Sequence, residues 1–88
     1  MAQRVVSIGF RGGLHARPAA TFVQAAAQAP LPVTIAVEGK RPVAAGSMLG
    51  VLSLAVGHGD QVILTAQGEH AEAVLDELAD LLGKESDA

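Results

Sequence analysis

The chain has 88 residues, half of them hydrophobic, with a formal net charge of −3, no cysteine and only two aromatic residues. This length predicts a single domain over residues 1–88, and the lack of cysteine excludes disulfides and thiolate zinc sites and is typical of a reducing cytoplasm. The negative charge argues against a nucleic-acid partner, and no apolar stretch is long enough for a signal or membrane segment. We therefore expect a cytoplasmic protein without membrane insertion.

The N-terminal third predicts a strand, a glycine-containing loop and a helix. Residues 4–8 alternate in the manner of a strand, and a loop follows over residues 9–13. From 16 to 28 the apolar residues recur at helical spacing, and Pro18 suits the first helical turn, where its missing N–H costs nothing. The apolar face of this helix consists of Ala19, Phe22, Val23 and Ala26.

The rest of the chain predicts a hairpin, a short helix, a strand and a final helix. Pro42 indicates that the second hairpin strand lies at a sheet edge, and Ser47 is a favourable N-cap for the short helix. The expected elements are a strand over 33–38, a turn at 38–40, a strand over 42–45, a helix from Ser47 to about residue 54, a turn at 57–60, a strand over 61–66 and a helix over 69–82.

The resulting order is βαββαβα. One tight hairpin, with helices as the other connections, is typical of an α+β fold in which helices pack on one face of a mainly antiparallel sheet. The final helix has the clearest apolar stripe, which consists of Val74, Leu75, Leu78, Leu81 and Leu82.

The sequence "GGLHARPAAT" places His15 and Arg17 at the start of the first predicted helix. A helix N-terminus presents unpaired N–H groups and a partial positive charge, which favour a phosphate and keep a histidine neutral and nucleophilic. Arg17 adds a forked donor that suits phosphate oxygens. The pattern fits a histidine that accepts and passes on a phosphoryl group. Two polar residues without a chemical role at a helix start remain an equally good explanation, although they would leave the glycines and Pro18 unexplained.

The second feature is "AGSMLGVLSLAV", in which apolar residues surround the short helix on every side. We expect Val51 and Leu54 to pack on the sheet. Met48, Leu49 and Leu52 should then be at least partly exposed, and such a patch favours an interaction surface. A helix buried on both sides is the alternative, and it is hard to arrange in so small a domain.

The remaining polar candidates are weaker. Ser47 is explained by its role as a helix cap, and a phosphorylation site is a second interpretation of the same residue. His58 and His70 have no metal-ligand spacing with His15, so we expect both on the surface. No metal site, cofactor motif or Walker loop is predicted.

These two motifs resemble those of HPr, the histidine-containing phosphocarrier family of the bacterial phosphoenolpyruvate-dependent sugar phosphotransferase system. The resemblance is carried by "GLHARPA" at 13–19 and "GSMLGVLSL" at 46–54, and it extends over nearly the whole chain. It implies an open-faced β-sandwich, which is a four-stranded antiparallel sheet of order 1-4-2-3 with three helices on one face. It also implies a stoichiometric carrier rather than an enzyme, with no cofactor.

The resemblance further implies roles for individual residues. His15 aligns with the histidine that is phosphorylated on Nδ1, and Arg17 with the arginine that stabilises the phosphohistidine. Ser47 aligns with a serine that a regulatory kinase phosphorylates in some members. The contact surface for Enzyme I and for the EIIA domains of sugar permeases aligns with Ala16, Met48, Leu49 and Leu52. An HPr kinase and a transcriptional regulator are further candidate partners of what we expect to be a monomer.

The chain departs from the family pattern at several positions. Gly46, Gly50 and Ala27 stand where many or some members carry a basic residue, which thins the positive rim around the apolar surface. Arg11 compensates in part, and Gly12 replaces a larger polar residue of the loop. Two alternatives stay open. One is a regulatory phosphocarrier, of a nitrogen-type phosphotransfer chain or a dihydroxyacetone kinase relay. The other is a binding module that never carries phosphate.

Overall fold

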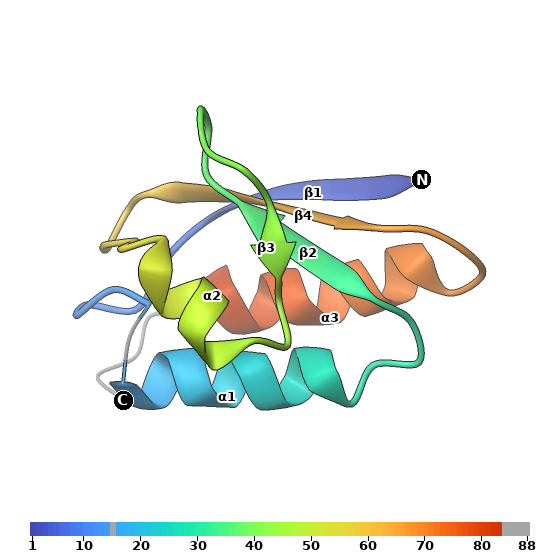
Figure 1. Cartoon of the computed structure of the whole chain (residues 1–88), viewed down its shortest axis with the longest axis horizontal. Coiled ribbons are helices and arrows are strands. Elements are labelled where there is room, and N and C mark those ends of the chain that lie inside the picture. Colours follow the sequence, from blue (N-terminus) through green and yellow to red (C-terminus); the bar gives the residue numbers. More distant parts are fainter. Residues whose placement is uncertain (15, 84–88) are drawn as a thin grey trace.

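The computed structural model describes residues 1–14 and 16–83 of the chain. Figure 1 shows a sheet above a layer of helices. The elements are β1 (Ala2–Ser7), α1 (Ala16–Ala27), β2 (Val33–Ala36), β3 (Val43–Ala44), α2 (Met48–Ser53), β4 (Gln61–Ala66) and α3 (Ala71–Gly83).

The four strands form one antiparallel sheet in the order β1-β4-β2-β3, and α1, α2 and α3 cover one face of it (Figure 1). The expected α+β class, the βαββαβα order and the open-faced β-sandwich are therefore confirmed. β3 lies at one edge directly after Pro42, where a residue without an N–H does no harm.

The core lies between the sheet and the helices. Along β4, Val62, Leu64 and Ala66 are buried while Ile63 and Thr65 are half-buried on the other face, as the two-residue period requires. The predicted helix stripes are also confirmed, because Val23 and Leu81 are half-buried and the other members are buried. The buried members of these stripes are Ala19, Phe22, Ala26, Val74, Leu75, Leu78 and Leu82.

Several predicted boundaries were wrong by a few residues. β1 begins at Ala2 because it pairs with the whole of β4, from Ala2 opposite Ala66 to Ser7 opposite Gln61. β2 ends at Ala36, since a turn closed by the Lys40 N–H to the Val37 carbonyl follows. The final helix begins at Ala71, because His70 has a φ of 68°, which is not a helical value.

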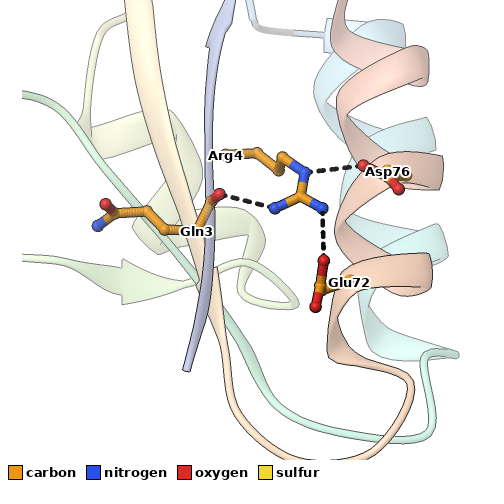
Figure 2. A network of polar contacts seen from close by, with 4 residues as sticks. All are labelled: Gln3, Arg4, Glu72 and Asp76. Carbon is orange, nitrogen blue, oxygen red and sulfur yellow. Dashed lines mark hydrogen bonds and ion pairs between the residues drawn. The ribbon is translucent and has the colours of Figure 1, made fainter.

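The edge strand β1 is tied to α3 by Arg4 (Figure 2). Its Nε donates to Oδ1 of Asp76 at 2.8 Å, its Nη2 lies 3.4 Å from Oε1 of Glu72, and its Nη1 donates to the Gln3 carbonyl at 2.9 Å. The hydrogen bond to Asp76 is the largest cause that raises the pKa of Arg4 above its usual value. Any arginine is charged at physiological pH, and these contacts link the start of the chain to its last helix.

Ala55, which follows the C-cap residue Leu54 of α2, has a φ of 52°, in the left-handed region that glycine occupies without strain. We predict that Ala55→Gly stabilises the protein by up to about 1 kcal/mol. The same substitution inside α1, Ala20→Gly, should destabilise it by about 1 kcal/mol. Thermal or urea unfolding of both variants measures the two effects, and a loss of stability in Ala55→Gly would contradict the assigned backbone conformation.

Candidate functional site

The segment that leads to α1 is held on two sides. The Ile8 N–H donates to the Asp60 carbonyl, and the Leu14 N–H donates to the Val56 carbonyl, each at 2.9 Å. On its other side, the Gly9 N–H donates to the Leu82 carbonyl of α3, also at 2.9 Å. The entry to α1 is thereby fixed against the loop between α2 and β4.

Gly13 lies close against the backbone of Val56 and Gly57. Its φ is +83°, and a Cβ added to it would lie 2.7 Å from the Val56 carbonyl oxygen and 2.9 Å from Cα of Gly57. Both neighbours are backbone atoms, so they cannot turn aside as a side chain would. A residue without a side chain is therefore required where this chain enters α1.

His15 lies outside the described residues. The helix begins at Ala16, whose side-chain surroundings are also undescribed, so the predicted partner contact of Ala16 is not placed here. Arg17 is exposed at the second position of α1, and Pro18 is buried at the third, where a backbone N–H would have no intrahelical acceptor. The helix therefore starts where the sequence predicts it, and the Arg17 side chain in its first turn is exposed. Arg11 and Gly12 in the preceding turn are also exposed.

α2 packs against α1 (Figure 1). Its outer residues are those expected from the sequence, since Leu49 is 83% exposed, Leu52 is 40% exposed and Met48 is half-buried. Val51 and Leu54 are buried in the core, also as expected. We call Met48, Leu49 and Leu52 the apolar patch, and the packing of α2 places it beside the helix that carries Arg17.

Ser47 caps α2, as the sequence predicts. It has an extended backbone, and its Oγ accepts from the Gly50 N–H at 3.1 Å. At Gly50 an added Cβ would lie 3.2 Å from Cβ of Val43 and 3.3 Å from Oγ of Ser47, so a larger residue would crowd the cap. Packing therefore explains why a small residue occupies position 50.

The other histidines lie apart from these features. His58 is exposed in the turn before β4, and His70 is exposed before α3, as expected for surface residues. Among residues 1–14 and 16–83, no three His, Cys, Asp or Glu side chains cluster in a way that could hold a metal ion. Within the same residues, no helix has the length and apolarity to cross a membrane.

Sequence reasoning missed the contribution of Val56 and Gly57 to the site. The sequence predicts only a turn at 57–60, and in the structure Oδ2 of Asp60 accepts from the Gly57 N–H at 2.9 Å within that turn. The glycines at 13 and 57 were a signal of close backbone approach, but nothing in their spacing indicated that they meet each other.

Comparisons with known proteins identify the family of the chain. The family model described as "PTS HPr component phosphorylation site" matches residues 2–84. The phosphocarrier protein HPr of Streptomyces coelicolor is 48% identical over 84 residues, which cover 96% of this chain and 90% of that protein. The HPr-like protein Crh of Bacillus subtilis is 44% identical over 79 residues, which cover 90% of this chain and 92% of that protein.

A solved HPr structure is also similar to the chain. The phosphocarrier protein HPr of Bacillus anthracis superimposes with a TM-score of 0.86 at 40% identity, covering 92% of this chain and 95% of that chain. By its fold the protein is an open-faced β-sandwich. The family model and the relatives show, more specifically, that the chain belongs to the HPr family of the phosphotransferase system.

The close approach at Gly13 gives a stability prediction with a matched control. Gly13→Ala should cost about 2–4 kcal/mol, because it combines a left-handed φ with overlap of backbone atoms. Gly39 has nearly the same φ, +85°, but no atom lies within 4 Å of its added Cβ. Gly39→Ala should therefore cost only about 1 kcal/mol. Equal losses in urea unfolding would show that the contact with residues 56 and 57 is not tight.

Proposed function

We propose that this chain is a phosphocarrier, in which His15 accepts a phosphoryl group from phospho-Enzyme I and passes it to EIIA domains of sugar permeases. The observation that carries the proposal is the exposed Arg17 in the first turn of α1, in a chain matched by a family model described as a phosphorylation site. The fixed loop before α1 supports it, because a transfer site needs a fixed position.

In the proposed reaction, Nδ1 of the neutral His15 ring attacks the phosphorus atom of phospho-Enzyme I. A P–N bond to Nδ1 forms as the bond between phosphorus and the donor atom breaks, and the electron pair of the broken bond leaves with the donor. The Arg17 guanidinium stabilises the phosphoryl oxygens. The N–H groups at the start of α1 add a partial positive charge next to them. The second transfer, to an EIIA domain, reverses these roles.

The apolar patch, with Ala16, is the proposed docking surface for both partners. Because α2 packs against α1, a partner seated on Leu49 and Leu52 would also lie over the helix that begins next to His15. Such a carrier acts in the cytoplasm, needs no metal or cofactor and is consumed and regenerated stoichiometrically.

A carrier in a regulatory phosphotransfer pathway would use the same site. Transfer assays with different EIIA proteins distinguish this role from sugar transport.

Ser47 is the proposed site of regulation. Its Oγ already lies at the start of α2 and precedes Met48 of the patch. A phosphate there would be compatible with the helix start, and it would place negative charge beside the docking surface. A regulatory kinase that modifies Ser47 would thereby oppose docking without unfolding the protein.

Incubation with phosphoenolpyruvate and Enzyme I should label the protein, and His15→Ala should abolish the label. Arg17→Ala should lower the transfer rate by about tenfold or more, because a donor to the phosphoryl oxygens is lost. Arg41→Ala, which removes another exposed arginine ahead of β3, serves as the control and should change little. Labelled His15→Ala protein would overturn the proposed acceptor.

The two roles of Ser47 can be separated by substitution. Ser47→Ala should cost about 1 kcal/mol of stability through loss of the cap, whereas Ser47→Asp should cost less than about 0.5 kcal/mol, since aspartate is also a good N-cap. Ser47→Asp should nevertheless slow transfer from Enzyme I by placing charge beside the patch. Unchanged transfer kinetics in Ser47→Asp would show that Ser47 serves only as a cap.

A further inference from the structure

The turn at 57–60, between α2 and β4, is closed in both directions by Asp60. The Asp60 N–H donates to the Gly57 carbonyl at 3.1 Å, and the Gly57 N–H donates back to Oδ2 of Asp60 at 2.9 Å. Gly59 has a φ of +85°, a value that the third position of one common turn type requires and that glycine adopts without strain. The Asp60 side chain therefore joins the last residue of this turn to its first.

The segment 8–14, which leads to His15, begins against this turn. The Ile8 N–H donates to the Asp60 carbonyl at 2.9 Å, and the Gly59 N–H donates to the Ile8 carbonyl at the same distance. The start of the segment is therefore paired with the last two residues of the turn.

The same segment ends against the first residue of the turn and the residue before it. The Leu14 N–H donates to the Val56 carbonyl at 2.9 Å, and a Cβ added to Gly13 would lie 2.9 Å from Cα of Gly57. Figure 1 shows the loop after β1 and the loop before β4 at the same end of the molecule, on the left. Because Leu14 directly precedes His15 in the chain, the turn fixes the point from which the chain continues to the histidine.

The bond from Gly57 to the Asp60 carboxylate is the contact that a substitution at position 60 can remove while the backbone bonds of the junction remain. A hydrogen bond from a backbone N–H to a carboxylate is charge-assisted and stronger than one between neutral groups. This bond lies at the surface, so its loss should loosen the turn locally without unfolding the core.

We propose that Asp60 is a positioning residue for phosphoryl transfer. It holds Gly57 in place, and through Gly57 and Val56 it sets the end of the segment that leads to His15. In this role Asp60 acts through the backbone and not on the phosphoryl group itself. A displacement of about 1 Å at a reacting group can cost on the order of 100-fold in rate, so a small loosening of this turn is enough to slow transfer. The inference rests on the proposed function, since it concerns the reaction at His15.

The test compares three substitutions of Asp60 in the transfer from phospho-Enzyme I to the full chain, with kcat and KM measured separately. Asp60→Ala removes the acceptor, and Asp60→Glu keeps the charge but moves the carboxylate outward by one methylene. Both should lower kcat by about threefold to tenfold, because a less fixed segment holds the reacting ring in the productive position for less of the time. KM should stay within about twofold of the parent, since the apolar patch is unchanged. Asp60→Asn keeps an oxygen acceptor of the same shape and should keep kcat within about twofold of the parent.

Amide hydrogen exchange shows whether the effect passes through the turn. In Asp60→Ala and Asp60→Glu, the Gly57 and Leu14 amides should exchange at least about threefold faster than in the parent, and the amides of β4 should exchange as in the parent. Equal acceleration in β4 would mean that Asp60 only adds to global stability, and this would overturn the positioning role.

Two controls lie in the turn between β2 and β3. Glu38→Ala removes an exposed carboxylate that lines the same surface pocket as Asp60, so it matches the loss of charge. Gly39→Ala destabilises the protein at a position where no atom lies within 4 Å of the added Cβ. Both should keep kcat within about twofold of the parent. Circular dichroism establishes that each variant is folded, and if Asp60→Ala does not fold, the comparison of Asp60→Glu with Asp60→Asn decides.

Three kinetic results would overturn the positioning role while the carrier function stands. The first is a kcat of Asp60→Ala and Asp60→Glu equal to that of Glu38→Ala. The second is an Asp60→Asn variant as slow as Asp60→Glu. The third is a raised KM at unchanged kcat, which would mean that Asp60 contacts the partner. A parent chain that Enzyme I does not label overturns the carrier function itself.

Discussion

The contact between Gly13 and the backbone of Val56 and Gly57 is the constraint on which the rest of the site depends. It brings the loop after β1 against the loop between α2 and β4, and the Leu14 N–H closes the join by donating to the Val56 carbonyl. This backbone approach holds the start of α1 against the segment that follows α2. The proposed phosphoryl site and the apolar patch are held in one geometry because they share this junction.

The distribution of charge follows the same division. Arg17 is the only charged residue of α1, α2 has none, and the exposed face of α3 carries four acids. Arg4 uses two of those acids, Glu72 and Asp76, to hold the edge strand β1. The acidic side of the molecule thus contributes to structure, and the proposed docking surface lies on helices that carry no acidic residue. The net charge of −3 conceals this asymmetry.

Much of the fold was predictable because its signals are local. Helical spacing gave the stripes of α1 and α3, Ser47 indicated the start of α2, and the motif "GLHARPA" indicated the family. The contacts that join distant residues were not predictable in this way. Nothing in the spacing of Gly13 and Gly57 indicates that they touch, and Arg4 meets Asp76 only because β1 and α3 pack together.

In the proposed carrier, the phosphate resides on a ring nitrogen of His15. Mass spectrometry of the protein phosphorylated by phosphoenolpyruvate and Enzyme I tests it most directly, with peptides compared before and after mild acid treatment. We expect one phosphate on the peptide that contains His15, and we expect acid to remove it because a P–N bond is acid-labile. An acid-stable phosphate on a serine or threonine, Ser47 included, would contradict it.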